Sequence, residues 1–377
     1  MRPTRALTQS AAHIRFVALP ALWLALFAYA GRPLVTAARA EGAPAIAAWS
    51  FILVSSLLPL LPWLVRGKKS AMHWIGYATL GLFSILLTVV AAGDFFRLAY
   101  WIVVRAPLNA RVFSFSLIGI AGALSFVGLV QARCPRVRRV DVAIDSLPED
   151  LDGYTIAQWS DVHVGPTIKH RFVANLVEKT NALGADAIVI TGDLVDGHVE
   201  ELRDQVAPLR DLSARDGVYF VTGNHEYYWR AADWVKEIER LGITFLKNQH
   251  RVIGRGGAKV VIAGVTDLAG RYTHKPDAYA ALAGAPRDAV KVLLSHRPQT
   301  ADVASRLGVH LQLSGHTHGG QFFPFNYLIR FFQPVVAGLH RVGSMWLYVS
   351  RGTGYWGPPS RLGVRGEITL LRFTRVT

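Results

Sequence analysis

Two histidines that lie two residues apart, His316 and His318, offer the strongest candidate chemistry in this 377-residue chain. They follow the alternating run Val309–Leu313, which predicts a strand, and glycines surround them. Residues two apart in an extended backbone point to the same side, and glycine lets the chain turn tightly. The spacing can therefore direct two imidazoles at a pair of neighbouring metal ions. An isolated pair of this kind is more often an ordinary turn, so partners are needed.

Four further groups of metal-ligand residues follow other predicted strands. In chain order they are Asp161 with His163, Asp193 with Asp196, Asn224 with His225 and Glu226, and His296. Ligand sites in α/β sheets lie beyond the carboxyl ends of the strands, so these groups would converge with the two histidines. Each group alone is weak, because such residues are also common in turns. Five of them in this order predict a metal site.

Short β-rich runs alternate with helix-like segments from about Arg138 onward. The predicted strands are 154–159, 186–191, 217–221, 259–265, 290–295 and 309–313, and the predicted helices are 170–183, 199–212, 228–241 and 299–307. Alternation at this spacing indicates a layered α/β domain. Two late strands, 345–350 and 367–373, predict a mixed sheet rather than a purely parallel one.

Four apolar runs occupy the first third of the chain, with predicted spans near 16–32, 43–65, 71–93 and 112–132. A helix of roughly 20 apolar residues crosses about 30 Å of hydrocarbon, so the last three runs are long enough and the first is shorter. A cleaved signal peptide is the alternative for the first run. We expect a membrane domain over 1–135 and a catalytic domain over 136–377.

The formal net charge of +15 at first suggests a nucleic-acid partner, but its distribution indicates a membrane. Residues 1–140 hold 15 Lys or Arg and 2 acidic residues, whereas residues 141–377 hold 26 and 24. Ten basic residues flank the spans on the side of the C-terminal domain and five on the other side. The positive-inside rule then predicts a multi-pass inner-membrane protein with a cytoplasmic catalytic domain. The single cysteine, Cys134, excludes an intramolecular disulfide.

Residues from about Val140 to Phe373 resemble the calcineurin-like metallophosphoesterase superfamily, whose signature is DxH, GDxxD, GNHE/D, H and GHTH. Tyr348–Gly354 and Gly357–Pro359 resemble its membrane-associated branch, which includes YkuE/YaeI-type phosphodiesterases and hydrolases of UDP-diacylglucosamine. The resemblance implies a metal-dependent phosphoric ester hydrolase. It also implies a four-layer β-sandwich flanked by helices, preceded by about four transmembrane helices. Trp159 stands where a smaller aliphatic residue is usual.

The resemblance also implies the ligand sets. One metal ion takes Asp161, His163, Asp193 and His318, and the other takes Asp193, Asn224, His296 and His316. Mixed nitrogen and oxygen ligands suit Mn²⁺, Fe²⁺/³⁺ or Zn²⁺. Two such ions would generate a bridging hydroxide and hold the phosphate oxygens for in-line attack. His225 would protonate the leaving oxygen, and Asp196 would orient it unless that aspartate only caps a turn.

Substrate contacts are expected from Arg297, Arg351 and Tyr227, although surface or packing roles suit these residues equally. The apolar segment 322–332 follows the histidine pair and adds Phe322, Phe323 and Phe325. It is either a buried lid or a patch that enters a bilayer or receives acyl chains. Residues 311–377 carry seven arginines and one acidic residue, a basic face that suits anionic lipid.

These observations predict a membrane-anchored two-metal phosphoesterase that cleaves a phosphodiester or pyrophosphate bond. Its partners would be membrane lipids and a phosphorylated or nucleotide-linked lipid substrate, such as UDP-diacylglucosamine or a phospholipid. One alternative is an enzyme that acts on soluble nucleotides or phosphoproteins. Another is a non-catalytic membrane sensor or transporter subunit, although such a protein would have no need of His225 as an acid.

Overall fold

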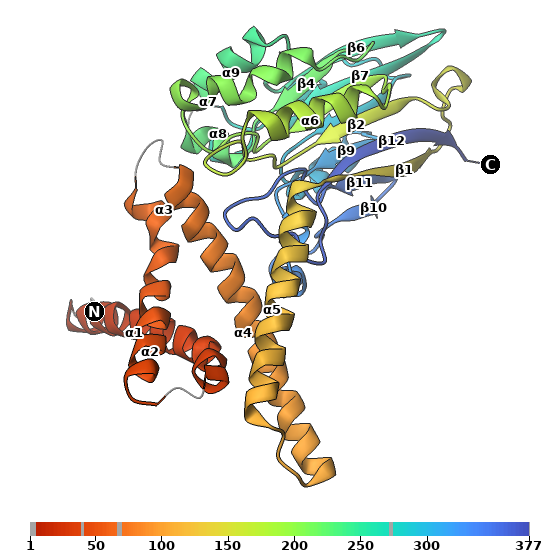
Figure 1. The fold of residues 1–377 in the computed structure, drawn as a ribbon. Coiled ribbons are helices and arrows are strands. Elements are labelled where there is room, and N and C mark those ends of the chain that lie inside the picture. The colour runs from red at the N-terminus through yellow and green to blue at the C-terminus, as the bar shows by residue number, and fades with distance from the viewer. Residues whose placement is uncertain (1–4, 39–40, 66–69, 271–273, 377) are drawn as a thin grey trace. The chain divides into compact units, whose positions relative to one another are not determined.

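The computed structural model describes the chain except for residues 1–4, 39–40, 66–69, 271–273 and 377 (Figure 1). It divides into two compact units, Met1–Val127 and Gly128–Thr377. The domain boundary expected at 135/136 stays a prediction. Among the basic residues used to predict orientation, Arg2, Arg39, Arg66, Lys68 and Lys69 lie outside the described residues.

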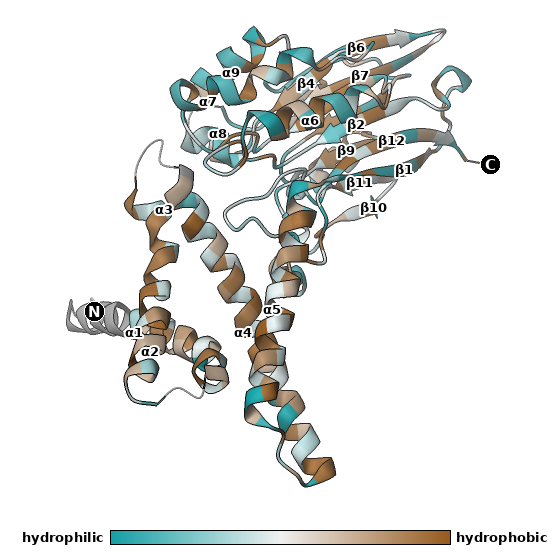
Figure 2. Cartoon of the chain, viewed as in Figure 1, coloured by the Kyte–Doolittle hydropathy of each residue, from teal (hydrophilic) through white to brown (hydrophobic). Residues whose placement is uncertain are grey.

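The first unit is helical. Its helices are α1 (Arg5–Ala38), α2 (Ala43–Leu57), the short α3 (Leu61–Leu64), α4 (Ser70–Val104) and α5 (Ala110–Arg133), which ends in the second unit. Within the described residues, four stretches are long and apolar enough to cross a membrane: Ala18–Ala38, Ala43–Leu64, Ala71–Val104 and Ala110–Arg133. Apolar residues cover these helices (Figure 2), and large side chains such as Trp63 and Phe95 are exposed, as they are on helices that face lipid.

Helices α1, α2 and α4 pack through small and aromatic residues. The rings of Phe27 and Phe83 stack with centroids 3.8 Å apart, and a side chain at Gly31 would meet Ile52 at 2.7 Å. On α4, Asp94 accepts a hydrogen bond of 2.7 Å from Tyr29 Oη and pairs with Arg32. An ionisable group within an apolar helix needs such partners, so this polar cluster ties α1 to α4.

The second unit contains two six-stranded sheets. The first has the order β1 (Arg136–Ile144), β12 (Glu367–Arg375), β2 (Thr155–Trp159), β3 (Ala187–Thr191), β4 (Val218–Val221) and β5 (Thr244–Phe245). The second has the order β10 (Gly338–Val342), β11 (Met345–Val349), β9 (Leu311–Ser314), β8 (Val290–Leu294), β7 (Ala258–Gly264) and β6 (Gln249–Arg255). Both sheets are mixed, as predicted, because β12 runs antiparallel to β2 and β10 antiparallel to β11.

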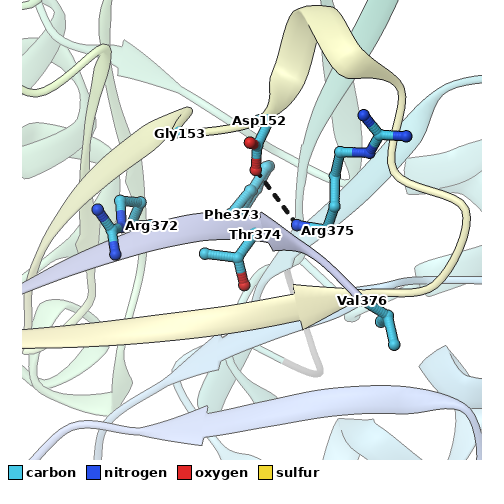
Figure 3. Close-up of a pocket in the computed structure, with 7 residues that line it drawn as sticks. All are labelled: Asp152, Gly153, Arg372, Phe373, Thr374, Arg375 and Val376. Atoms are coloured by element: carbon cyan, nitrogen blue, oxygen red, sulfur yellow. Dashed lines mark hydrogen bonds between the residues drawn. The ribbon is translucent and has the colours of Figure 1, made fainter.

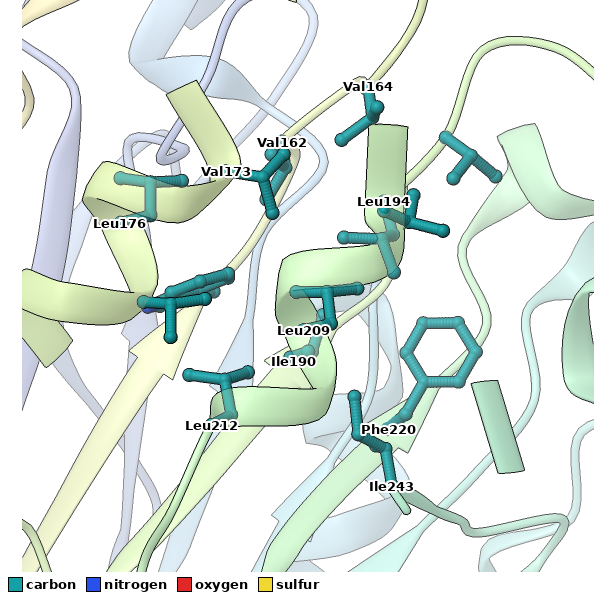
Figure 4. Packing of buried hydrophobic residues seen from close by; sticks show 14 of the residues in the cluster. Val162, Val164, Val173, Leu176, Ile190, Leu194, Leu209, Leu212, Phe220 and Ile243 are labelled. Carbon is teal, nitrogen blue, oxygen red and sulfur yellow. The ribbon is translucent and has the colours of Figure 1, made fainter. Parts of the chain in front are cut away.

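Seven helices accompany these sheets in the described part of the second unit, besides the end of α5. They are α6 (His170–Asn181), α7 (Val199–Val206), α8 (Asn224–Tyr228), α9 (Ala231–Arg240), α10 (Ala278–Leu282), α11 (Ala301–Arg306) and α12 (Phe325–Leu328). One apolar cluster joins the first sheet to α6, α7 and α9 (Figure 4), a second lies between the sheets, and a third joins the second sheet to α10 and α11. The predicted four-layer α/β sandwich is therefore confirmed.

Several elements differ from the sequence-based expectation. The strands β1, β5, β6 and β10 were not predicted; all four lie at sheet edges, and polar residues interrupt the alternation in β1, β6 and β10. The helix predicted over 228–241 is wrong at its start, since the chain forms α8 and then breaks. The break occurs because Arg230 adopts a left-handed conformation (φ 66°), after which α9 begins at Ala231.

The unusual Trp159 generates a test of this packing. Its ring is fully buried, and its Nε1 donates a hydrogen bond of 2.8 Å to Thr180 Oγ1 on α6. Trp159→Ala removes about 3–5 kcal/mol of stability, so we expect the thermal unfolding midpoint of this unit in the full chain to fall by about 6–20 °C. The exposed Tyr279→Ala is the control. Equal midpoints for the two variants would contradict this packing.

Candidate metal centre

The candidate ligands lie where the two sheets present the carboxyl ends of parallel strands. Strands β2, β3 and β4 are parallel neighbours in the first sheet, and β8 and β9 are parallel neighbours in the second. The turns after these strands hold the five groups identified from the sequence, so one end of the sandwich collects them all. Each side chain therefore has its position fixed by a short loop on a buried strand.

Three clusters of candidate ligands form there. Asp161, His163 and His318 make one, His163, Asp193 and His225 a second, and Asp193, His296 and His316 a third, with the ligand atoms of each cluster within 4.8 Å of one another. Asp193 belongs to two of the clusters. Its Oδ2 lies 3.2 Å from His296 Nε2 and 4.0 Å from His163 Nε2. Asp193 therefore lies where the second and third clusters meet.

Five of these residues adopt the left-handed backbone conformation that non-glycine residues rarely use. They are Asp161, His163, Asp193, His316 and His318, with φ between 52° and 73°. A non-glycine residue in this region costs on the order of 1–3 kcal/mol and persists only where its surroundings enforce it. The turns thus hold these ligands in place at a conformational cost, which is typical of functional sites.

Two glycines allow the backbones to approach the ligands closely. A side chain at Gly315 would collide with Ser160 and Asp161, and one at Gly223 would collide with the carboxylate of Asp193. Because neither position can hold a Cβ atom, the glycines of the GHTH and GNHE sequences are required by packing.

Hydrogen bonds orient the histidine ligands. His296 Nδ1 lies 2.8 Å from the carbonyl oxygen of Thr191, to which it donates, so that Nε2 remains available as a ligand. His163 Nδ1 lies 3.1 Å from Asp196 Oδ2 in the same way, with its Nε2 directed at the cluster. A carbonyl or carboxylate on the outer nitrogen fixes the tautomer and the ring orientation of a metal-binding histidine.

Glu226 joins two of the ligand loops from beneath. It is buried and accepts backbone N–H groups from Asp193 at 3.0 Å, Leu194 at 2.7 Å and Gly223 at 2.6 Å. Burial, with the nearby charge of Asp193, raises the pKa of Glu226 to about 7. The sequence places Glu226 in a motif but indicates no role for it. In the structure it ties the loops after β3 and β4 together.

The candidate histidine ligands differ in protonation, because burial lowers the pKa of His296 but Asp193 outweighs burial and raises that pKa to about 10. Burial, with the charges of His296 and Arg297, lowers the pKa of His316 to about 3, so its ring is neutral at pH 7 and can act as a ligand. Burial raises the pKa of Asp193, but the charge and hydrogen bond of His296 outweigh it and lower that pKa. A cation bound here would displace a proton from His296, because a ligand nitrogen must be deprotonated.

His225 lies at the open side of the site. Its Nε2 is 3.9 Å from Asp193 Oδ2, and its Nδ1 makes a short hydrogen bond to Asp196. Burial lowers the pKa of His225, but the hydrogen bond and charge of Asp196 raise it to about 9. The rings of Tyr228 and Trp356, which the sequence did not single out, lie 5.1 and 5.7 Å from the His225 ring.

Arg297 contacts two of the candidate metal ligands, Asn224 and His316. Its Nη2 donates to Asn224 Oδ1 at 3.3 Å and its Nη1 lies 3.3 Å from His316 Nε2. The guanidinium is held by Asp267, a buried carboxylate 2.8 Å from Nε. Asp267 was missed, although its place two residues after the predicted strand 259–265 matches the pattern of the other strand-end residues.

Arg361 was also missed, and it supports His318 from behind. It is fully buried, and it donates to the carbonyl oxygens of Gly354 and Arg351 and, at 3.0 Å, of His318. Its Nη2 lies 3.2 Å from His318 Nδ1. Burial lowers the pKa of Arg361 to about 10, which leaves it charged at neutral pH.

The other predicted substrate-contact residues differ in their partners and in their burial. The Tyr227 hydroxyl lies 3.3 Å from both Thr222 and His274 rather than beside the candidate ligands. Arg351 Nη1 donates to Glu367 at 3.3 Å. Phe322 is buried, whereas Phe323 and Phe325 are exposed.

A cavity of about 590 Å³ lies elsewhere, around Asp152 and residues 372–376 (Figure 3). Because β12 is antiparallel to β2, its end at Arg375 lies at the amino-terminal end of β2, whereas the candidate ligands follow the carboxyl end. This cavity is therefore separate from the metal chemistry.

The donor set fits divalent metal ions. Imidazole nitrogens and carboxylate oxygens occur together, and Asn224 can add a neutral amide oxygen, a mixture that suits Mn²⁺, Fe or Zn²⁺. The fit rests on the shared position of Asp193, the neutral His316 and the oriented His296 and His163.

Comparisons with known proteins agree with this geometry. A family model for calcineurin-like phosphoesterases matches residues 154–320. A transmembrane protein with metallophosphoesterase domain from Danio rerio is 38% identical over 262 residues, which cover 66% of this chain and 60% of that protein. The chain thus spans about 60% of that relative and of a Bos taurus relative that carries the same name.

Bacterial relatives align over more of their length. An uncharacterized metallophosphoesterase from Campylobacter jejuni is 31% identical over 337 residues, covering 86% of this chain and 88% of that protein. The uncharacterized metallophosphoesterase YkuE from Bacillus subtilis is 30% identical, covering 59% and 80%. Among solved structures, a 5'-nucleotidase precursor from Thermus thermophilus aligns at 17% identity with a TM-score of 0.38, covering 58% of this chain and 54% of that one, too weakly for inference.

The four apolar helices and the transmembrane relatives together support membrane association. The phosphoesterase match and the clustered ligands lie in the second unit. The chain therefore belongs to the calcineurin-like metallophosphoesterase family, in the branch of YkuE and the transmembrane metallophosphoesterases, and carries the domain of a metal-dependent phosphoesterase.

Proposed function

We propose that this protein is a membrane-anchored two-metal phosphoesterase that cleaves a phosphodiester or pyrophosphate bond in a lipid-linked substrate. The observation that carries the lipid assignment is the exposed apolar segment directly after the histidine ligands. The relatives from Danio rerio and Bos taurus are each named a transmembrane protein with metallophosphoesterase domain, which is consistent with a substrate at the membrane.

The ligands divide between two ions that share Asp193. Asp161, His163, Asp193 and His318 would hold one, and Asp193, Asn224, His296 and His316 would hold the other. When bound, such ions supply an activated water and positive charge for the phosphate oxygens. The residues around them fix the ligand orientation and exclude bulk water, since most are buried.

His225 is proposed as the proton donor to the leaving oxygen. Asp196 contacts both His163 and His225, so one carboxylate orients a metal ligand and the proposed acid together. The raised pKa of His225 keeps its ring protonated at neutral pH, which suits donation. The His225 side chain is 13% exposed and its ring lies 5.7 Å from that of Trp356, and the leaving group is proposed to depart past this pair.

Arg297 is proposed to bind a phosphate oxygen. Its side chain is 25% exposed, and its guanidinium contacts Asn224 and His316 as well as the fully buried carboxylate of Asp267. A planar guanidinium binds phosphate with good geometry, and Asp267 limits its rotation.

The apolar segment 322–332 is proposed to contact the lipid portion. Phe323, Phe325, Phe331 and Phe332 are exposed in it, while the buried Phe322 packs on Phe325 with ring centroids 5.3 Å apart and supports the segment. A contiguous exposed apolar surface beside a polar site is costly in water and marks a contact with lipid or protein. Its distance along the chain from His318 is only a few residues, so an acyl chain held there would place its headgroup near the ions.

Removal of the shared carboxylate tests the two-metal assignment. We expect Asp193→Asn in the full chain to lower turnover of bis(p-nitrophenyl) phosphate with Mn²⁺ more than about 100-fold, since changes behind a metal ligand already cost 10–100-fold. Metal content measured by mass spectrometry should fall as well. The exposed Asp204→Asn is the matched control, and equal activity in the two variants would refute the assignment.

The lipid assignment is tested by making the apolar segment polar. Phe323→Ser with Phe325→Ser should lower the ratio of lipid turnover to bis(p-nitrophenyl) phosphate turnover by at least about 100-fold, because burying each of the two rings stabilises by roughly 1.5–3 kcal/mol. UDP-diacylglucosamine and a phospholipid are the lipid substrates to assay. Tyr279→Ser is the control, and an unchanged ratio would favour a soluble nucleotide or phosphoprotein substrate.

We also propose that the protein lies in the inner membrane with the second unit in the cytoplasm. The ten-to-five distribution of basic residues supports this orientation. A reporter fused after Val376 should give a cytoplasmic signal, and one inserted after Asn109, between α4 and α5, should give a periplasmic one. A periplasmic signal from the C-terminal fusion would reverse the orientation.

A further inference from the structure

The segment after the histidine pair has polar residues beside a cavity. It consists of α12 and a following 3₁₀ turn, Ile329–Phe331. Asn326 lies on α12, Arg330 lies in the 3₁₀ turn, and Gln333 follows that turn by two residues. All three line a cavity of about 420 Å³ in the second unit, together with His340 and Arg351.

The outward side of the same segment is apolar. Tyr327 and Leu328 are 58% and 46% exposed, and Phe331 and Phe332 are 83% and 81% exposed. A helix on the surface of a water-soluble domain shows the opposite arrangement, with its apolar stripe against the core. This reversal is explained if the outer surface enters a bilayer, for which apolar residues are the favourable choice.

The cavity offers positive charge and hydrogen-bond donors. The Arg330 side chain makes no hydrogen bond or ion pair with any residue that the structure describes, and the Arg351 guanidinium donates to Glu367 at 3.3 Å. Asn326 Oδ1 is buried and lacks a hydrogen-bond partner within the described part of the chain. None of the described residues that line the cavity is acidic. Such a lining suits a phosphate group that carries a hydroxylated substituent.

The cavity adjoins the metal centre without being part of it. Gly319, the residue after His318, contributes to its wall. Arg361 lies between the two sites, since its Nη1 donates to the carbonyl oxygens of both His318 and Arg351. The candidate metal ligands do not line the cavity, so it can bind a second group.

We propose that this cavity binds the phosphate of an anionic phospholipid headgroup while the apolar side of α12 and the following turn sits among the acyl chains. The cavity is then a docking site for the bilayer beside the metal centre. This proposal shares the membrane contact of segment 322–332 with the proposed function, but it does not depend on which substrate is cleaved.

Native mass spectrometry of the full chain released from detergent tests this site, because it separates intact bound lipid from any hydrolysis product by mass. Dioctanoyl phosphatidylglycerol should bind about tenfold more tightly than dioctanoyl phosphatidylcholine, and Arg330→Gln should weaken the anionic lipid by about tenfold. Arg330→Lys, which retains the charge, should recover part of the affinity. Arg306→Gln, an exposed arginine on α11, removes the same charge outside the cavity and should change nothing.

A second arm separates lipid from free phosphate. Glycerophosphoglycerol carries the same headgroup without acyl chains, and we expect it to bind at least about tenfold more weakly. Phe331→Ser with Phe332→Ser should weaken only the lipid. If Arg330→Gln matches Arg306→Gln, the docking site is refuted, whatever lipid turnover shows. If the phenylalanine variant leaves lipid affinity unchanged, the cavity takes a soluble phosphate and lipid docking is refuted. Absence of lipid turnover would contradict only the proposed function.

Discussion

The shared position of Asp193 is the constraint on which the rest of the site depends. This buried carboxylate lies between histidines from both sheets, 3.2 Å from His296 and 4.0 Å from His163. A charge buried in this way is tolerated only with compensating partners. The histidines, the backbone amide of His225 and a cation can supply them. The left-handed turns and the hydrogen bond that the Asp193 N–H donates to Glu226 keep the carboxylate between its partners.

Two carboxylates outside the candidate ligand sets, Asp196 and Asp267, orient other side chains of the site. Asp196 contacts two histidines with different proposed roles, and Asp267 holds Arg297 toward the same opening. Each of these carboxylates acts on the substrate only through another residue. Asp196 orients His225 and Asp267 orients Arg297. The rings of Tyr228 and Trp356 flank His225.

Much of the site was predictable from the sequence because its ligands follow strands at short, regular distances. Asp161 and Asp193 each lie two residues after a buried strand, and parallel pairing brings such positions together. Arg361 and Trp356 carry no comparable local signal, since only tertiary packing brings them to the site. Asp267 alone had a usable clue, its strand-end position.

The edge strands were harder to predict from the sequence than the central strands. The layered α/β arrangement followed from alternating strands and helices, and the four layers from the family resemblance, but edge strands such as β1 and β10 mix polar and apolar residues and hide the period of two. The sequence also led us to interpret segment 322–332 as a single unit, either a buried lid or an exposed apolar patch. Packing separates it into a buried Phe322, an exposed apolar face and a polar face on a cavity.

The position of β12 has a consequence for synthesis of the chain. The last strand lies between β1 and β2, parallel to the first and antiparallel to the second. Strand β1 directly follows α5, so until β12 leaves the ribosome this strand has no neighbour in its sheet. The newly made chain can therefore insert its membrane helices well before the catalytic unit closes. Loss of the last ten residues would leave the strand that directly follows the membrane helices unpaired, with the metal ligands all still present.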